Sequence, residues 1–235
     1  MYHYLKQLIF PNKCIVCQTI LEDRVIGHLC DKCYSFVLRH NLCPHCGRPY
    51  SIDDVHCAYC DKEEMDSNTQ VVALFPYEDG FRKGVLRWKY KGLRKYAKGY
   101  ADLFVNDLCI IDRFHIDALV PVPLSRARFR KRGFNQAQDL ANEISKLAGV
   151  KVYDILTRVK ETKPQSKCSK EERLSNIKGS IAVKPEINAL EVKHIAVLDD
   201  IYTTGATIRE CIHAIKRQNI TGDSKIYVLI VCIGV

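Results

Sequence analysis

The chain has 235 residues, a hydrophobic content of 47% and a formal net charge of +9 at pH 7. This length suits one or two domains with a substantial core, and no apolar run is long enough to span a membrane. The excess of positive charge favours polyanionic partners or phosphorylated substrates. The first residues lack the long apolar region of a signal peptide, so we expect a cytoplasmic protein.

Eight of the twelve cysteines lie before residue 61 and form four CxxC pairs. They are Cys14/Cys17, Cys30/Cys33, Cys43/Cys46 and Cys57/Cys60. A CxxC turn presents two thiolates on one side, which is half of a tetrahedral zinc site. The four pairs therefore predict two structural Zn²⁺ sites of four thiolates each, in a module over residues 1–66. Few apolar residues accompany the cysteines, so we expect this module to need its metal to fold.

Three features of the Cys-rich module stay open at this point. Joining pairs that are neighbours in sequence leaves loops of 12 and 10 residues, which costs the least loop entropy, but an interleaved arrangement is the alternative. Disulfides are the alternative to zinc. Four nearby histidines could each replace a thiolate: His28, His40, His45 and His56.

We interpret the polar run over residues 61–70 as a linker to a second domain over residues 67–235. A strand is predicted near the start of that domain, at 71–77. Between Phe81 and Lys98 there are eight Lys or Arg residues and no acid, with three aromatic rings among them. Such cations can follow nucleic-acid phosphates while rings stack on bases. We therefore name six candidates for binding single-stranded DNA: Arg87, Trp88, Lys89, Lys91, Arg94 and Lys95. The alternative is a solvated basic face whose rings belong to the core.

A second core strand is predicted at 117–123, and an amphipathic helix at 137–148 that ends at Gly149. Between them, five of the seven residues from Arg126 to Arg132 are cationic, which favours a bound polyanion over mere solubility charge. The stretch 156–183 is polar and has no clean period. Long loops of this kind are usually functional or disordered, and this one could close over a bound diphosphate.

The stretch Ile195–Thr207 carries the most specific signal in the chain. Four apolar residues predict a buried parallel strand, followed by Asp199 and Asp200, a turn of small and hydroxyl residues, and a helix. Free N–H groups at a helix start, together with threonine hydroxyls, can hold a phosphate. Two adjacent carboxylates would repel that phosphate but suit sugar hydroxyls. The alternative is an ordinary strand–turn–helix with threonine caps.

This stretch resembles the 5-phosphoribosyl-1-pyrophosphate (PRPP) signature of type I phosphoribosyltransferases. The resemblance implies an α/β fold with a mainly parallel sheet and flanking helices. It implies that Asp199 and Asp200 meet ribose hydroxyls and that Mg²⁺ accompanies PRPP. The 5-phosphate would then be held by Thr203, Thr204, Gly205, Ala206 and Thr207. In that family a loop after an early core strand holds the pyrophosphate, and the candidates here are Ser125, Arg126 and Arg128.

Nearly the whole chain resembles the ComF family of bacterial natural competence. The CxxC region, LRWKYKG, PVPLSRARFRKRGFNQA and LDDIYTTGAT occur in that family's order, as does a pattern of spaced polar residues before the last of them. That pattern consists of Arg158, Thr162, Gln165, Arg173 and Asn176. The resemblance implies a phosphoribosyltransferase-like domain behind a zinc module, a role in handling incoming single-stranded DNA, and protein partners in the competence machinery.

Three functions fit these observations. The first is a DNA-uptake factor that binds single-stranded DNA, with PRPP as ligand or regulator. The second is an active phosphoribosyltransferase, which would transfer ribose 5-phosphate from PRPP to an unidentified acceptor and release pyrophosphate. The third is a PRPP-sensing adaptor. No residue in the sequence stands out as a catalytic base.

Overall fold

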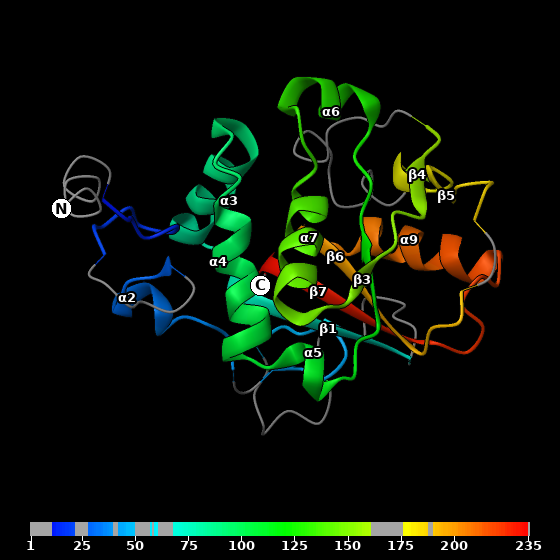
Figure 1. Ribbon diagram of the computed structural model, residues 1–235, viewed down its shortest axis with the longest axis horizontal. Helices are drawn as coiled ribbons and strands as arrows, with labels where there is room; N and C mark the ends of the chain where they lie inside the picture. The colour runs from blue at the N-terminus through cyan, green and yellow to red at the C-terminus, as the bar shows by residue number, and fades with distance from the viewer. Residues whose placement is uncertain are drawn as a thin grey trace.

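The computed structural model describes residues 11–21, 28–39, 42–49, 57, 59–60, 68–160, 176–187 and 190–234. Within this part, five strands form a sheet of order β1-β7-β6-β2-β3 in which all neighbouring strands run parallel (Figure 1). The strands are β1 (Thr69–Pro76), β2 (Ala118–Pro121), β3 (Lys151–Val152), β6 (His194–Tyr202) and β7 (Lys225–Ile233). The predicted α/β fold with a mainly parallel sheet is confirmed.

The central strand β6 is buried on both faces of the sheet. Ile195 and Val197 lie in the core on one face, while Ala196 and Leu198 lie in the core on the other. A strand covered on both sides needs a continuous apolar run, which is what the sequence offers here. The strand is longer than predicted, because its pairing with β7 continues to Tyr202. The two aspartates are therefore part of the strand and do not follow it.

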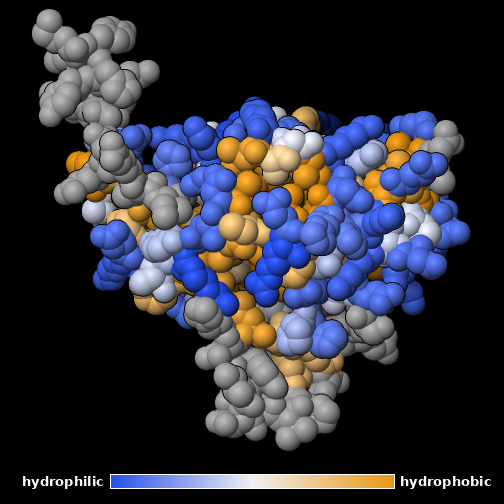
Figure 2. Space-filling view, turned by 60° about the horizontal axis from the view of Figure 1, so that its bottom comes forward, coloured by the Kyte–Doolittle hydropathy of each residue, from blue (hydrophilic) through white to orange (hydrophobic). Residues whose placement is uncertain are grey.

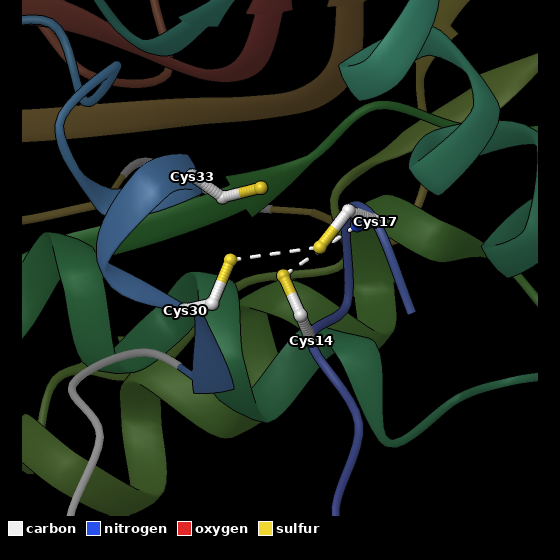
Figure 3. Close-up of side chains that lie close together, drawn as sticks. All are labelled: Cys14, Cys17, Cys30 and Cys33. Carbon is white, nitrogen blue, oxygen red and sulfur yellow. Dashed lines mark hydrogen bonds between the residues drawn. The ribbon is translucent and has the colours of Figure 1, made fainter. Parts of the chain in front are cut away.

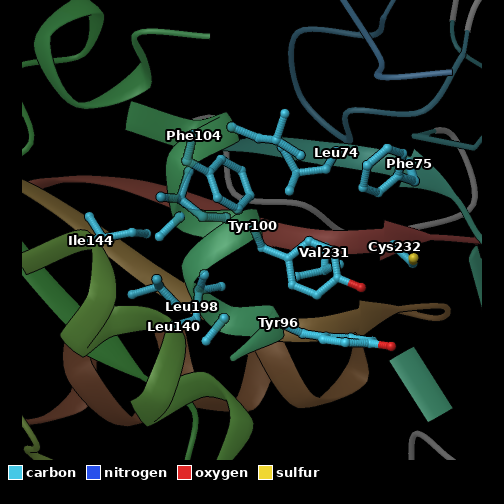
Figure 4. Close-up of a cluster of buried hydrophobic side chains, with 14 of the residues drawn as sticks. Leu74, Phe75, Tyr96, Tyr100, Phe104, Leu140, Ile144, Leu198, Val231 and Cys232 are labelled. Carbon is cyan, nitrogen blue, oxygen red and sulfur yellow. The ribbon is translucent and has the colours of Figure 1, made fainter. Parts of the chain in front are cut away.

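Helices cover both faces of the sheet (Figure 1). One face carries α3 (Asp79–Lys91), α4 (Tyr96–Asp102), the π-helix η2 (Leu103–Asp107), α5 (Ile110–Arg113) and α7 (Gln136–Ala148). The other face carries α9 (Ala206–Arg217) and the antiparallel pair of β4 (Leu156–Arg158) and β5 (Ile181–Val183). In the first of these cores, Leu140 and Ile144 of α7 and Tyr100 of α4 pack with Leu198 and Val231 of the sheet (Figure 4).

The aromatic residues of the basic segment divide between core and surface. Trp88 has no exposed surface, and its ring lies 5.3 Å from that of Tyr100. Tyr96 is also buried, whereas Tyr90 is 58% exposed. The reason is helical spacing, since Trp88 shares the inward face of α3 with Phe81 and Val85. The assignment of Trp88 to DNA stacking is therefore wrong, and the alternative interpretation holds for this ring.

The Cys-rich segment packs directly against the sheet and its helices. The backbone N–H of Leu38 donates to the carbonyl of Leu74 (2.9 Å), and that of Val71 donates to the carbonyl of His45 (2.9 Å). Cys14, Ile15 and Val16 belong to the same buried cluster as Trp88 and Tyr100. This part of the chain also contains the short helix α2 (Asp31–Tyr34). The predicted boundary between residues 66 and 67 lies outside the described residues.

None of the helices in the described part of the chain is long and apolar enough to cross a membrane. Figure 2 views the molecule with the lower side of Figure 1 brought forward. Hydrophilic side chains cover most of the described surface in this view, and hydrophobic ones gather near its centre. The helix α6 (Arg126–Arg132) lies at the top of Figure 1.

Candidate functional site

The eight cysteines of the CxxC pairs form two compact clusters. One joins Cys14, Cys17, Cys30 and Cys33, and the other joins Cys43, Cys46, Cys57 and Cys60, with all four sulfur atoms of each within 4.8 Å of one another. This is the sequential pairing. In the first cluster the sulfur atoms converge from the N-terminal turn and from the start of α2 (Figure 3). Neither His28 nor His45 belongs to a cluster, and His40 and His56 lie outside the described residues.

The sulfur spacing fits tetrahedral zinc. Four ligands at ~2.3 Å from one ion place neighbouring sulfur atoms about 3.8 Å apart. The Cys17–Cys30 and Cys43–Cys60 sulfur pairs are 3.5 Å apart, and the Cys46–Cys57 pair is 3.6 Å apart. A disulfide needs about 2.05 Å, so the disulfide alternative does not fit these positions. The two clusters are consistent with two structural zinc ions.

The CxxC turns of Cys14/Cys17 and Cys43/Cys46, which begin the two clusters, have the same backbone geometry. In one, the N–H of Gln18 donates to the carbonyl of Cys14 (3.0 Å). In the other, the N–H of Gly47 donates to the carbonyl of Cys43 (2.9 Å). Gln18 and Gly47 both have a positive φ, 71° and 69°. Each turn is closed by a short antiparallel bridge, so the two sites are a structural repeat.

A cleft of about 690 Å³ opens at the carboxyl ends of β2 and β6. These strands are neighbours, yet the chain leaves them in opposite directions, from β2 towards β3 at one edge and from β6 towards β7. Open parallel sheets bind ligands at such switch points. The cleft is lined by Val122–Leu124 after β2, by Asp199–Ile201 of β6, and by residues of α3 and α6.

The acid pair lies at the base of the cleft. Asp200 is 8% exposed and forms an ion pair with Lys89 (Nζ to Oδ1, 2.7 Å). The backbone N–H of Asp200 donates to Oδ1 of Asp199 (2.8 Å). Burial and the neighbouring Asp200 carboxylate raise the pKa of Asp199 to about 7, against the opposing effect of Lys89 and Arg158. Near neutral pH, Asp199 can therefore offer a carboxylate or a protonated carboxyl to a hydroxyl-bearing ligand.

The predicted phosphate loop forms a tight turn between β6 and α9. Gly205 precedes the helix at φ 69°, and a Cβ at this position would lie 2.4 Å from the Tyr202 hydroxyl, so only glycine fits. Thr203 and Thr207 line the cleft, whereas Thr204 is buried. The first-turn N–H groups of α9 have no intrahelical acceptors and are directed to this end of the helix. The turn thus offers two hydroxyls and a helix N-terminus to an anion.

Cations surround the opening. Five of them line the cleft: Arg82, Lys89, Arg128, Arg132 and Arg158. Nε of Arg158 donates to the carbonyl of Pro123 (3.2 Å), which holds this side chain at the cleft. Arg132 donates to Gln136 (2.9 Å) and to the Tyr90 hydroxyl (3.2 Å). The cleft can therefore hold more than one phosphate group beside a hydroxyl-bearing sugar.

The segment predicted as a pyrophosphate loop is the helix α6. Oγ of Ser125 accepts from the N–H of Arg128 (3.4 Å) as the N-cap, and Gly133 ends the helix at φ 79°. Serine before a run of arginine, alanine and lysine is a helix start signal, which explains the difference. Of the three candidates, Arg128 lines the cleft, Ser125 is occupied as a cap, and Arg126 is exposed and does not line the cleft.

The six DNA candidates do not share one surface. Besides the buried Trp88, Arg87 donates to the carbonyl of Val16 in the Cys-rich segment, and Lys89 turns into the cleft. Arg94 makes two hydrogen bonds to Asp139, at 2.6 and 2.8 Å. Lys91 and Lys95 are exposed and have no ion pair among the described residues.

Sequence reasoning missed Arg82 and Arg132 as cleft residues. A signal existed, because Arg82, Leu86 and Lys89 recur at i, i+4 and i+7 and so lie on one face of α3. Arg128 and Arg132 have the same relation on α6. Of the polar pattern, Arg158 lines the cleft, while Thr162, Gln165 and Arg173 lie outside the described residues.

Known proteins resemble this chain in both of its parts. The Double zinc ribbon domain matches residues 5–66. Competence protein F of Haemophilus influenzae is 27% identical over 216 residues, which cover 90% of this chain and 93% of that protein. Competence protein ComFC of Bacillus subtilis is 28% identical and covers 86% of this chain and 77% of its own length. The DNA utilization protein YhgH of Salmonella typhimurium is 27% identical, with coverage of 90% and 93%.

Among solved structures, an adenine phosphoribosyltransferase aligns with 63% of this chain and 75% of its own, at 11% identity and a TM-score of 0.36. The sequence relatives span nearly the full chain, and the double zinc ribbon matches the two cysteine clusters of the structure. Over most of its length the chain is therefore similar to competence proteins of the ComF/ComFC type, and it carries a double zinc ribbon match ahead of a parallel α/β sheet.

Proposed function

We propose that the cleft binds PRPP or a related sugar phosphate together with Mg²⁺, and that the protein handles single-stranded DNA in the cytoplasm. The observation that carries the ligand proposal is the placing of an acid pair, a hydroxyl-rich helix start and five cations around one cleft. A sugar with vicinal hydroxyls and phosphate groups at both ends would satisfy all three. Mg²⁺ would enter with the diphosphate, because it is usually held by one or two carboxylates plus substrate phosphates.

Titration calorimetry with PRPP and Mg²⁺ tests the ligand proposal. Ribose 5-phosphate and inorganic pyrophosphate, titrated separately, show which end of the cleft each half of PRPP occupies. Arg128→Glu should weaken pyrophosphate more than ribose 5-phosphate, because a reversed charge on α6 acts on the diphosphate side. Thr207→Val should weaken the binding of ribose 5-phosphate more than that of pyrophosphate. Absence of PRPP binding by the native chain would refute the proposal.

The affinity for PRPP should rise with pH through neutrality. Because the pKa of Asp199 is raised to about 7, its carboxylate fraction grows from roughly a tenth at pH 6 to nine tenths at pH 8. A carboxylate accepts a ribose hydroxyl more strongly than a neutral carboxyl does, so the affinity should increase by up to about tenfold.

The variant Asp199→Asn is the control for this pH dependence, since it keeps only the titration of the ligand's own phosphates.

The raised pKa of Asp199 also predicts an effect on the stability of the fold. A carboxyl with a raised native pKa stabilises the fold below the unfolded value near 4, and that contribution is lost as the pH rises towards 7. Thermal unfolding at pH 8 should therefore occur at a higher temperature in Asp199→Asn. Equal pH profiles for the two proteins would contradict the assignment.

Single-stranded DNA is the second ligand we propose, and the residues exposed beside the cleft support this proposal. Tyr90 and Phe129 are 58% and 51% exposed. The guanidinium of Arg132 lies 5.0 Å from the centre of the Tyr90 ring. Exposed cations of α6 adjoin these rings: Arg126, Arg130 and Lys131. Exposed rings with adjacent cations are the elements of sequence-tolerant single-strand binding. The relatives named as competence and DNA utilization proteins support a role of this kind.

Replacing both Tyr90 and Phe129 by alanine should weaken single-stranded DNA binding at least tenfold, since stacking contributes ~1–3 kcal/mol per base. Reversing Arg130 and Lys131 to glutamate should also lower the salt dependence, by ~0.7 log units per lost phosphate contact. The matched control reverses Arg113 and Lys225, exposed cations that lie before β2 and at the start of β7, near the amino ends of the strands and away from the cleft. Fluorescence anisotropy with an oligothymidylate measures both effects. Equal losses in the two charge-reversed proteins would leave only unspecific attraction to a basic protein.

Transferase activity is a separate question from binding. Acids and cations line much of the cleft, and none of its lining residues identifies an acceptor. Release of pyrophosphate from PRPP in the presence of single-stranded DNA, nucleobases or amines would identify an acceptor. Without release, PRPP acts as a regulatory ligand, which is the adaptor alternative.

A further inference from the structure

We call the segment with the Cys14, Cys17, Cys30 and Cys33 cluster the first zinc ribbon, and the segment with the Cys43, Cys46, Cys57 and Cys60 cluster the second. Arg48 connects the second zinc ribbon to the candidate phosphate loop. It follows the CxxC turn of Cys43 and Cys46, is 2% exposed, and reaches across to the carboxyl ends of β6 and β7. One terminal nitrogen donates to the carbonyl of Thr203 (2.5 Å), and Nε donates to the carbonyl of Gly234 (2.8 Å). The guanidinium also lies 4.7 Å from the ring centre of Tyr59 and 5.3 Å from that of Tyr202.

The structural repeat shows that this connection is particular to the second ribbon. The backbone N–H of Cys14 donates to the carbonyl of Thr19 (2.8 Å), and the N–H of Cys43 donates in the same way to the carbonyl of Arg48 (2.9 Å). Thr19 and Arg48 therefore occupy equivalent positions. The Thr19 hydroxyl accepts from the thiol of Cys17 within its own ribbon (3.2 Å), whereas the Arg48 side chain leaves its ribbon and contacts the loop.

The contact orients the loop for an anion. In a trans peptide the carbonyl of one residue and the N–H of the next point in opposite directions. Because Arg48 draws the Thr203 carbonyl towards the ribbon, the N–H of Thr204 is directed away from the ribbon. Arg209 holds the next carbonyl, that of Thr204, in a similar way (2.8 Å). With two successive carbonyls bound by arginines, the loop presents N–H groups to a ligand, which is the requirement of an anion site.

The second ribbon fixes Arg48 from its other side. Gly47 has φ 69°, and a Cβ there would lie 2.5 Å from the carbonyl of Val71, so the turn is seated closely on β1. Cys43 and Cys46 flank the same turn and belong to the second cluster. A structural zinc site of this kind contributes folding free energy to the backbone around it. Loss of the metal would therefore release the backbone from which Arg48 extends.

We propose that Arg48 is the positioning residue through which the second zinc ribbon holds the Thr203–Thr207 loop, so that ligand binding in the cleft depends on metal at the second site and not at the first. This rests on the proposed function for the part that concerns the ligand. The mechanical part, from ribbon to loop, stands independently and can be measured without any ligand.

Hydrogen exchange followed by mass spectrometry tests the ligand-independent part. Arg48→Met should raise exchange in peptides covering residues 201–207 while the chain still binds two zinc ions, and Arg48→Lys should restore part of the protection. Thr19→Val, at the equivalent position, should leave these peptides unchanged. Cys60→Ser should lose one zinc ion and raise exchange at 201–207. Cys17→Ser should lose one zinc ion and raise exchange in the first ribbon and in the helices packed on it, but not at 201–207. Equal effects of the two cysteine variants at 201–207, or no effect of Arg48→Met, would overturn the proposal.

Calorimetry with PRPP and Mg²⁺ tests the part that rests on the proposed function. Arg48→Met should weaken binding about tenfold, the size of one lost charge-assisted hydrogen bond. The effects of Arg48→Met and Thr207→Val should be less than additive, because both act on the phosphate, whereas Arg48→Met and Asp199→Ala should be additive. Additivity in both pairs would contradict a positioning role. If the native chain binds no PRPP, the proposed ligand is wrong, and the exchange results alone decide the coupling between ribbon and loop.

Discussion

Replacing Cys33 by serine should reduce the bound zinc from about two ions to about one per chain and lower the stability of the whole protein. Cys33 is buried in the first cluster. Structural zinc sites contribute apparent binding free energies of about 10–16 kcal/mol at neutral pH, which equals or exceeds the stability of a typical domain. Even partial loss of this contribution should therefore lower the unfolding temperature by many degrees.

The expected loss is not confined to the ribbon. Ile15, Val16 and Cys33 share a buried cluster with Trp88 of α3 and Tyr100 of α4. The side chain of Gln18 also donates to the Tyr96 hydroxyl (2.7 Å). Disorder in the first ribbon would remove packing from the helices that cover one face of the sheet, so near-ultraviolet circular dichroism should change with the metal content.

Cys109→Ser is the matched control for this experiment, because Cys109 is exposed and belongs to neither cluster. It should keep both metal ions and the native unfolding temperature. Metal analysis by plasma mass spectrometry after purification without chelators gives the count. A Cys33→Ser protein that retains two zinc ions, or a native protein that carries none, would contradict the assignment of the clusters.

The sequence predicted those parts of the protein whose chemistry is local. The CxxC turns determine which thiolates meet, and short loops favour the sequential pairing that the structure has. The run Ile195–Leu198 predicted a buried parallel strand, and the turn before α9 lies where glycine and threonine indicated. In each case the residues that interact are close in the chain, so the pattern carries the information.

Features that depend on tertiary packing could not be predicted in the same way. Trp88 and Tyr90 are two residues apart in a basic helix, and only the position of the sheet decides that the first is buried and the second exposed. Lys89 resembled a DNA contact until the fold placed it 2.7 Å from Asp200, a residue 111 positions later. Arg48 gave no signal at all, because its partners belong to the end of the chain and to the loop after β6.

Changing Asp199 and Asp200 together to asparagine should weaken PRPP binding at least tenfold while leaving inorganic pyrophosphate as tightly bound as before or more tightly. The two carboxylates would each accept a ribose hydroxyl, and charge-assisted hydrogen bonds contribute ~1.5–3 kcal/mol. Asparagine keeps the size of the side chain and removes the charge. The double substitution also deprives Lys89 of its ion-pair partner, which leaves an additional uncompensated cation in a cleft that already has four arginines.

The comparison of the two ligands separates the role of the acid pair from general damage to the cleft. Pyrophosphate has no hydroxyls, so it does not use the acids and should gain from the freed charge of Lys89. Lys89→Met is the matched control, since it removes the cation and retains the acids, and it should weaken pyrophosphate binding. Calorimetry at pH 8, where Asp199 of the native protein is mostly ionised, gives the largest contrast. If both ligands weaken in parallel in the double variant, the aspartates maintain the shape of the cleft and do not recognise the sugar.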